Sequence, residues 1–151
     1  GCIAIEISKL FESATILGSD VCEKALKVAK KNNNQSNNKV NFIKSNWFSD
    51  IEGQFDLIVS NPPYIPKGTK LEASTLFEPK VALFSEETGS EDLKKIISEA
   101  INYLKTNGTL ILEHGIGQSS ELSSYMKEVG YKNIGALNDL KDINRFVYGC
   151  K

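Results

Sequence analysis

The chain has 151 residues, 40% of them hydrophobic and 25% charged, which is typical of one globular domain and excludes general disorder. Its formal net charge of -1 lacks the basic excess of a dedicated nucleic-acid binder. The 3 cysteines are widely spaced and accompany 1 histidine, so we expect free thiols and no metal site. No apolar run could span a bilayer and no leader segment opens the chain, so we expect a cytoplasmic protein, or an organellar one if its source is eukaryotic.

The hydrophobic pattern predicts helices that alternate with strands. A polar stretch, KKNNNQSNNK at 30–39, is expected to be a solvated loop. In chain order, we expect a helix over 3–11, a strand over 14–18, a helix over 25–29 capped by Asp20, strands over 40–43 and 55–60, a helix over 93–104, a turn at Asn107-Gly108, a strand over 109–112, a helix over 122–129 stopped by Gly130, and strands over 131–137 and 145–148.

This alternation indicates an α/β fold with a mostly parallel sheet. The last two strands have no helix between them, so they should form an antiparallel hairpin at one edge. In such sheets ligands bind outside the carboxyl ends of the strands. The chemically informative residues of this chain fall at those ends.

The sharpest motif is Asn61-Pro62-Pro63-Tyr64, which directly follows the strand FDLIVS, expected to be buried. Two prolines fix the backbone and remove two donors, so their carbonyls and the Asn61 side chain should face the cleft as acceptors. Such acceptors could bind both N–H bonds of a planar NH2 group, with Tyr64 packed on it. A rigid turn that only ends the strand is the alternative.

Two further segments follow predicted strands. Asp20 lies 19 positions after Gly1, which is similar to the spacing from a glycine turn to the acid that binds ribose hydroxyls. It could also act only as a helix cap. Trp47, the only tryptophan, could stack on an adenine or cover the core, and Asn46 could hydrogen-bond a base edge.

Together these residues resemble the class I S-adenosylmethionine-dependent methyltransferases that act on planar nitrogens. Further segments narrow the resemblance to the HemK/PrmC-type peptide chain release factor glutamine methyltransferases, over essentially the whole chain. They are GCIAI at 1–5, NWF at 46–48, FEP at 77–79 followed by AL, LEHG at 112–115, and DINRFV at 142–147 with Gly149.

The resemblance implies a Rossmann-like catalytic domain over 1–151 that uses S-adenosylmethionine and no metal. It implies that Asp20 binds the cofactor ribose and Trp47 lies by the adenine, with Gly1, Asn46 and Asn61 also on the cofactor. It further implies that Asn61-Pro62-Pro63-Tyr64 bind the glutamine amide in the GGQ motif of a translation release factor, the expected partner. His114 is interpreted as structural, because no strong base is needed.

The chain departs from the family at two points. Asn46 replaces an aspartate, although its carbonyl could still accept from adenine. The chain begins at Gly1, so the resemblance implies that the central first strand and the preceding glycines are missing. We therefore expect a catalytic domain that is incomplete at its N-terminus, with two strand edges left open and weak cofactor binding by the isolated chain.

Two other functions stay open at this point. A nucleic-acid amino methyltransferase acting on adenine N6 or guanine N2 would bind a planar nitrogen with the same acceptors. This function would require a basic surface. A non-catalytic Rossmann-like remnant would fit an incomplete glycine motif.

Overall fold

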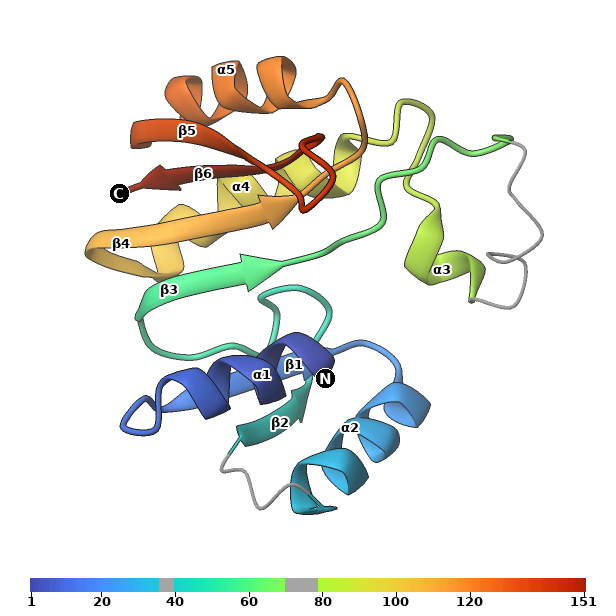
Figure 1. The fold of residues 1–151 in the computed structure, drawn as a ribbon, viewed down its shortest axis with the longest axis vertical. Coiled ribbons are helices and arrows are strands. Elements are labelled where there is room, and N and C mark those ends of the chain that lie inside the picture. Colours follow the sequence, from blue (N-terminus) through green and yellow to red (C-terminus); the bar gives the residue numbers. More distant parts are fainter. Residues whose placement is uncertain (36–39, 70–78) are drawn as a thin grey trace. The chain divides into compact units, whose positions relative to one another are not determined.

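The computed structural model describes residues 1–35, 40–69 and 79–151. The chain forms two compact units, Gly1–Glu52 and Gly53–Lys151, and each carries its own sheet (Figure 1). Among the described residues, no strand pairs with both sheets. Across that same part of the chain, no helix is long and apolar enough to cross a membrane.

The first unit is a helix–strand–helix–strand segment. Its elements are α1 (Cys2–Leu10), β1 (Ile16–Asp20), α2 (Glu23–Gln35) and β2 (Val40–Lys44). The two strands are parallel, in a register that runs from Ile16 opposite Val40 to Asp20 opposite Lys44. One apolar cluster joins the helices to this sheet, formed by Ile5, Leu26, Ala29, Val40 and Phe42.

The expected loop over 30–39 is wrong in its first half, because α2 continues to Gln35. The reason is Asn33, a polar residue that is buried in the helix. Its side-chain amide donates to Val40 O at 3.2 Å, and its carbonyl accepts from Val40 N at 3.3 Å. The amide thus satisfies the first backbone groups of β2 and lets a polar sequence remain helical. Residues 36–39 lie outside the described part.

The second unit is a four-stranded sheet with two long helices. Its elements are β3 (Phe55–Ser60), α3 (Lys80–Leu83), α4 (Glu91–Tyr103), β4 (Leu104–Glu113), α5 (Ser119–Val129), β5 (Lys132–Asn138) and β6 (Asn144–Cys150). The strand order is β3-β4-β6-β5. Strands β3 and β4 are parallel, whereas β6 is antiparallel to both β4 and β5. This confirms the α/β fold with an antiparallel hairpin at one edge.

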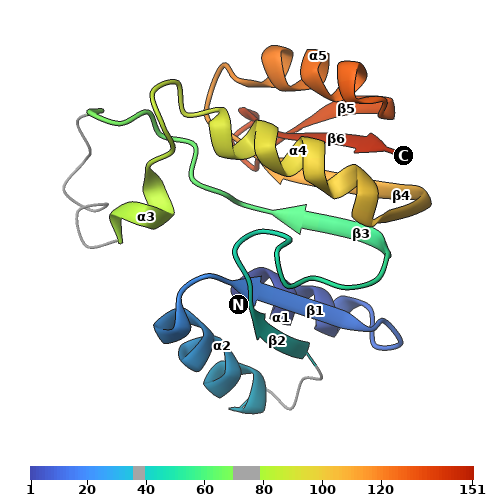
Figure 2. The ribbon, with the colours of Figure 1, turned by 180° about the vertical axis from the view of Figure 1, so that it is seen from behind.

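Helices α4 and α5 supply most of the core of the second unit. Helix α4 packs against β4, and α5 packs against β5, β6 and α4 (Figure 2). The fully buried apolar side chains come from these helices and from the central strands: Leu93, Ile96, Ile97, Ala100, Leu104, Leu110, Leu112, Leu122, Met126 and Val147. As expected, Gly130 ends α5, in the left-handed conformation with φ of 108°.

Two expectations about strands are corrected. Strand β3 is not buried: none of its residues is fully covered, and Leu57 is 40% exposed. Among the described residues β3 pairs only with β4, so it is an edge strand of its sheet. Strand β4 begins before the expected turn, at Leu104. Asn107 has φ of 64° inside it, and the pairing with β3 shifts register there.

Candidate functional site

The carboxyl edge of the first unit gathers the residues expected to bind a nucleoside. Asp20 is the last residue of β1, and Ser45 directly follows β2. A hydrogen bond connects the carboxyl ends of the two strands, because Ser45 N donates to Asp20 O at 3.2 Å. Asp20 does not cap α2 as expected, since the helix begins three residues later, at Glu23. Its carboxylate instead accepts from Cys22 N at 2.8 Å, which fixes its orientation ahead of the helix.

A tight turn after β2 sets the position of Asn46 and Trp47. The buried Ser45 donates from Oγ to Trp47 O at 2.8 Å, and Trp47 has φ of 53°. Ser49 N and Oγ donate to Asn46 O at 3.2 and 2.8 Å. Trp47 is half-buried and lies outside the buried apolar cluster, while Asn46 is exposed. The turn therefore leaves an aromatic side chain and an amide at the strand ends.

Gly1 lies where the backbone passes close to the core. It precedes α1 as its N-cap, and a Cβ there would lie 2.5 Å from Ala29 Cβ and 3.0 Å from Phe42 Cζ. The N-terminus lies beside the carboxyl end of β2 in both views (Figures 1 and 2). The structure thus brings Gly1, Asp20, Asn46 and Trp47 to one end of the first unit.

This set of side chains fits a nucleoside. A carboxylate has about four acceptor positions, so Asp20 can bind Cys22 N and still accept from two ribose hydroxyls. The half-buried Trp47 and exposed Asn46 offer an aromatic surface and an amide for a base. Over residues 1–35, 40–69 and 79–151, no three His, Cys, Asp or Glu side chains gather as metal ligands.

In the second unit, Asn61-Pro62-Pro63-Tyr64 leaves the carboxyl end of β3. Pro62 is buried and Asn61 is exposed. Among the described residues, no donor engages the Asn61 side chain or the carbonyls of Pro62 and Pro63. These oxygens follow a parallel strand at its carboxyl end, where α/β sheets bind ligands. They form a set of acceptors without internal partners in the described chain.

Tyr64 is held by its hydroxyl. Arg145 Nη2 donates to Tyr64 Oη at 2.6 Å, and Tyr64 Oη donates to Glu113 Oε1 at 3.2 Å. The same guanidinium donates to Glu113 Oε1 at 3.3 Å and lies 5.1 Å from the centre of the Tyr64 ring. Burial raises the pKa of the Tyr64 phenol, and the Arg145 charge acts against this shift. The phenol is therefore neutral near pH 7.

The backbone around Tyr64 is held as well. Gln118 Nε2 donates to Tyr64 O at 3.4 Å, while its Oε1 accepts from Gly115 N at 2.7 Å. The next residue, Ile65, pairs with the segment before α4: Ile65 N donates to Leu83 O at 3.1 Å, and Ser85 N donates to Ile65 O at 3.0 Å. The loop after β3 is thus fixed from two sides.

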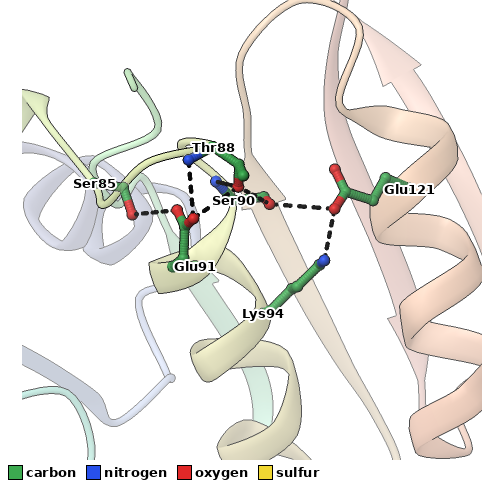
Figure 3. Close-up of polar contacts among 6 residues, drawn as sticks. All are labelled: Ser85, Thr88, Ser90, Glu91, Lys94 and Glu121. Atoms are coloured by element: carbon green, nitrogen blue, oxygen red, sulfur yellow. Dashed lines mark hydrogen bonds and ion pairs between the residues drawn. The ribbon is translucent and has the colours of Figure 1, made fainter. Parts of the chain in front are cut away.

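A polar network then anchors that segment to α4 and α5 (Figure 3). Thr88 N and Oγ1 donate to Glu91 Oε1 at 2.9 and 2.8 Å, and Ser85 Oγ donates to Glu91 Oε2 at 3.5 Å. Ser90 Oγ donates to Glu121 Oε1 at 3.2 Å, and Lys94 pairs with the same oxygen at 2.6 Å. The Thr88 N–H donor is the main cause that lowers the pKa of Glu91 to about 2.

The sequence predicts no role for Gln118, which lies outside every motif named above. Glu113 and Arg145 lie within the LEHG and DINRFV segments, but no role at the site is predicted for them. Their signal was their position at strand ends: Glu113 ends β4, and Arg145 lies near the start of the antiparallel β6, at the same edge. His114 is fully buried; its Nδ1 lies 2.8 Å from Gly115 O, and its Nε2 has no hydrogen-bond partner in the described part of the chain. Phe77 and Glu78 lie outside the described residues.

Known proteins similar to this chain are methyltransferases. A 38% identical relative, named release factor glutamine methyltransferase, occurs in Pasteurella multocida; the match covers 98% of this chain and 52% of that protein. A protein of Rickettsia typhi, named bifunctional methyltransferase, is 39% identical, over 97% of this chain and 30% of that protein. The chain thus spans about half the length of the first and under a third of the second.

Solved structures share the fold. A methyltransferase from Pyrococcus furiosus matches 99% of this chain and 68% of its own, with a TM-score of 0.75 and 22% identity. A ribosomal protein L11 methylase from Lactobacillus delbrueckii subsp. bulgaricus matches 99% of this chain and 63% of its own, with a TM-score of 0.70 and 18% identity. The fold is that of the class I methyltransferases. The methyltransferase small domain family matches residues 1–78, about half of the sequence, and the chain belongs to this family.

Proposed function

We propose that this chain transfers a methyl group from S-adenosylmethionine to the side-chain amide nitrogen of the glutamine in the GGQ motif of a translation release factor. The observation that carries the proposal is the set of acceptors at Asn61, Pro62 and Pro63, which no described donor engages. The name of the 38% identical relative supports this choice of substrate. Such a substrate implies a site of translation, which is the cytoplasm or an organelle.

The proposal assigns cofactor binding mainly to the first unit. Asp20 accepts from the ribose hydroxyls, Trp47 lies by the adenine, Asn46 accepts from its amino group, and Gly1 allows a close approach of the backbone. S-adenosylmethionine supplies an electrophilic methyl group on a sulfonium. Asn61 is assigned to both the cofactor and the substrate amide.

The residues after β3 address the main chemical difficulty. An amide nitrogen is a poor nucleophile because its lone pair is delocalised into the carbonyl. The Asn61 side chain and the Pro62 carbonyl accept from the two amide N–H bonds and aim the nitrogen along the line of displacement. Tyr64 packs on the planar group. Holding the amide in this orientation lowers the activation barrier by several kcal/mol, because the reacting atoms no longer have to find the right geometry by diffusion.

No described residue has to act as a strong base. As the bond between the methyl carbon and the sulfonium sulfur breaks and S-adenosylhomocysteine leaves, the amide nitrogen bonds to that carbon and becomes positively charged; its proton then leaves to water. His114 is fully buried against the backbone, and the phenol of Tyr64 is engaged by Arg145 and Glu113. The work of the site is therefore orientation of the amide.

A competition between substrate classes tests the proposal. The chain is incubated with labelled S-adenosylmethionine at saturating concentration, together with a release factor, duplex DNA and RNA in one mixture. We expect label on the release factor alone, and none on a release factor whose GGQ glutamine is replaced by alanine. Label on adenine or guanine amino groups would support the nucleic-acid alternative. No label on any substrate would support the non-catalytic one.

A further inference from the structure

The hydroxyl of Tyr64 is fully used within the protein. It accepts a hydrogen bond from Arg145 at 2.6 Å and donates one to Glu113 at 3.2 Å. These partners are 81 and 49 residues away along the chain. They meet because Glu113 ends β4 and faces Phe146, the neighbour of Arg145, in the antiparallel pairing with β6.

The geometry of this contact is that of a clamp. The side chains of Arg145 and Glu113 are only 20% and 26% exposed, so their ion pair is shielded from much of the screening that weakens surface pairs. Arg145 contacts both the hydroxyl and the ring of Tyr64. Separately, Gln118 donates a hydrogen bond to the Tyr64 carbonyl. The ring is therefore fixed at its hydroxyl and at its backbone.

We propose that Glu113 and Arg145 are positioning residues, which hold Tyr64 by its hydroxyl so that its ring is a fixed wall for the substrate amide and its phenol takes no part in proton transfer. This inference rests on the proposed function and deepens it. It assigns a task to two segments, LEHG and the NRFV strand, that contribute no substrate contact in the proposed mechanism. The task is to set the orientation of the amide.

A double-mutant cycle tests whether Glu113 acts through the hydroxyl. In Glu113→Leu and in Tyr64→Phe we expect kcat for methylation of a GGQ peptide to fall about tenfold, with KM changed less than about twofold, because orientation rather than affinity is lost. In the Tyr64→Phe background, Glu113→Leu should then change kcat by less than about twofold. Multiplicative losses would overturn the inference.

Three further readouts separate positioning from a merely structural role. Glu113→Gln keeps an accepting oxygen and should recover most of the kcat lost in Glu113→Leu. Tyr64→Phe should keep the shape of the pH–rate profile; loss of a limb would make the phenol a proton-transfer group and overturn the inference. Asp56→Asn is the matched control: it breaks an ion pair with Lys105, 2.8 Å long, near the opposite end of β3, and should leave kcat unchanged.

The two proposals can fail separately. If the unchanged chain does not methylate the peptide at saturating S-adenosylmethionine, the proposed function fails. The role of Glu113 and Arg145 in holding Tyr64 is then tested by NMR, from the nuclear Overhauser effects between protons of the Tyr64 ring and of Arg145. We expect these effects in the unchanged chain and in Glu113→Gln, and their loss in Glu113→Leu. Effects that persist in Glu113→Leu would show that Glu113 does not position Tyr64.

Discussion

The loop after β3 contains two kinds of residue. Asn61, Pro62 and Pro63 offer oxygen atoms that no described donor occupies. Tyr64 instead has its hydroxyl and its carbonyl bonded within the second unit. This contrast separates groups that are free to bind a ligand from groups that are fixed so as to shape its surroundings. Substitutions at the two kinds of residue should therefore differ in their effects.

Replacing Asn61 should remove one acceptor and spare the fold. Asn61 is exposed and its side chain engages no described donor, so Asn61→Ala should leave the unfolding transition unchanged. The kcat for glutamine methylation should fall about 100-fold, which is typical for loss of one polar group that orients a reacting centre. Steady-state kinetics together with thermal unfolding check this. An Asn61→Ala variant with undiminished kcat would exclude the assigned role.

Replacing Asp20 should weaken binding of the cofactor. A hydrogen bond to a charged group contributes about 1.5–3 kcal/mol, so Asp20→Ala should weaken binding of S-adenosylhomocysteine about 10- to 100-fold. Isothermal titration calorimetry measures this, with Asp50→Ala, an exposed residue after the same turn, as the matched control. Equal affinities for Asp20→Ala and the unchanged chain would contradict the ribose assignment.

At the scale of elements, the segment between α3 and α4 determines how the loop after β3 is held. Its backbone pairs with Ile65, and Gly89 lies directly against Tyr64: a Cβ on Gly89 would be 2.5 Å from Tyr64 O. The Glu91 network anchors the same segment to the start of α4 (Figure 3). Substitutions in this segment should therefore alter the conformation of the loop after β3, although the segment itself does not contact the substrate.

Two glycines with positive φ provide a matched comparison. Gly130, with φ of 108°, has free space for a Cβ, so Gly130→Ala should cost about 1–2 kcal/mol of stability from backbone strain alone and leave kcat unchanged. Gly89, with φ of 79°, adds a collision with the Tyr64 backbone. Gly89→Ala should therefore lower both stability and kcat. Urea unfolding and kinetics measure the two effects, and equal kcat values for both variants would argue against the coupling.

The carboxylate of Glu91 should make stability depend on pH in the acid range. Its pKa is lowered from 4.5 to about 2 in the folded chain, mainly by the Thr88 N–H, so its contribution is fully present above pH 4.5. The contribution is lost as the pH falls from 4.5 through about 2, because the unfolded state binds the proton first. Urea unfolding of the unchanged chain and of Glu91→Gln should show a stability gap that closes over this interval. A gap that stays constant would refute the assignment.

For the whole molecule, the sequence pattern predicted the fold better than it predicted the contacts. Periodicity located α1, α4 and α5, and the missing helix between the last strands predicted the hairpin of β5 and β6. The polar end of α2 was missed because one buried side chain, Asn33, satisfies the backbone of the next strand. Composition does not reveal such a contact.

For the candidate site, the sequence predicted where its residues lie in the fold but not their contacts. Residues that follow strands could be placed at the carboxyl edges, as Asp20, Asn46, Trp47 and the loop after β3 were. The clamp on Tyr64 could not be predicted, because its contacts join positions 49 and 81 residues apart and depend on the register of β4 with β6. Local patterns carry no information on that register.

The central claim is that the acceptors after β3 direct methyl transfer to an amide nitrogen. Tandem mass spectrometry of a release factor incubated with the chain and S-adenosylmethionine tests it most directly. We predict one added methyl group on the side-chain nitrogen of the GGQ glutamine, and its loss with Asn61→Ala. An unmodified glutamine, or a methyl group on any other atom of the release factor, would contradict the claim.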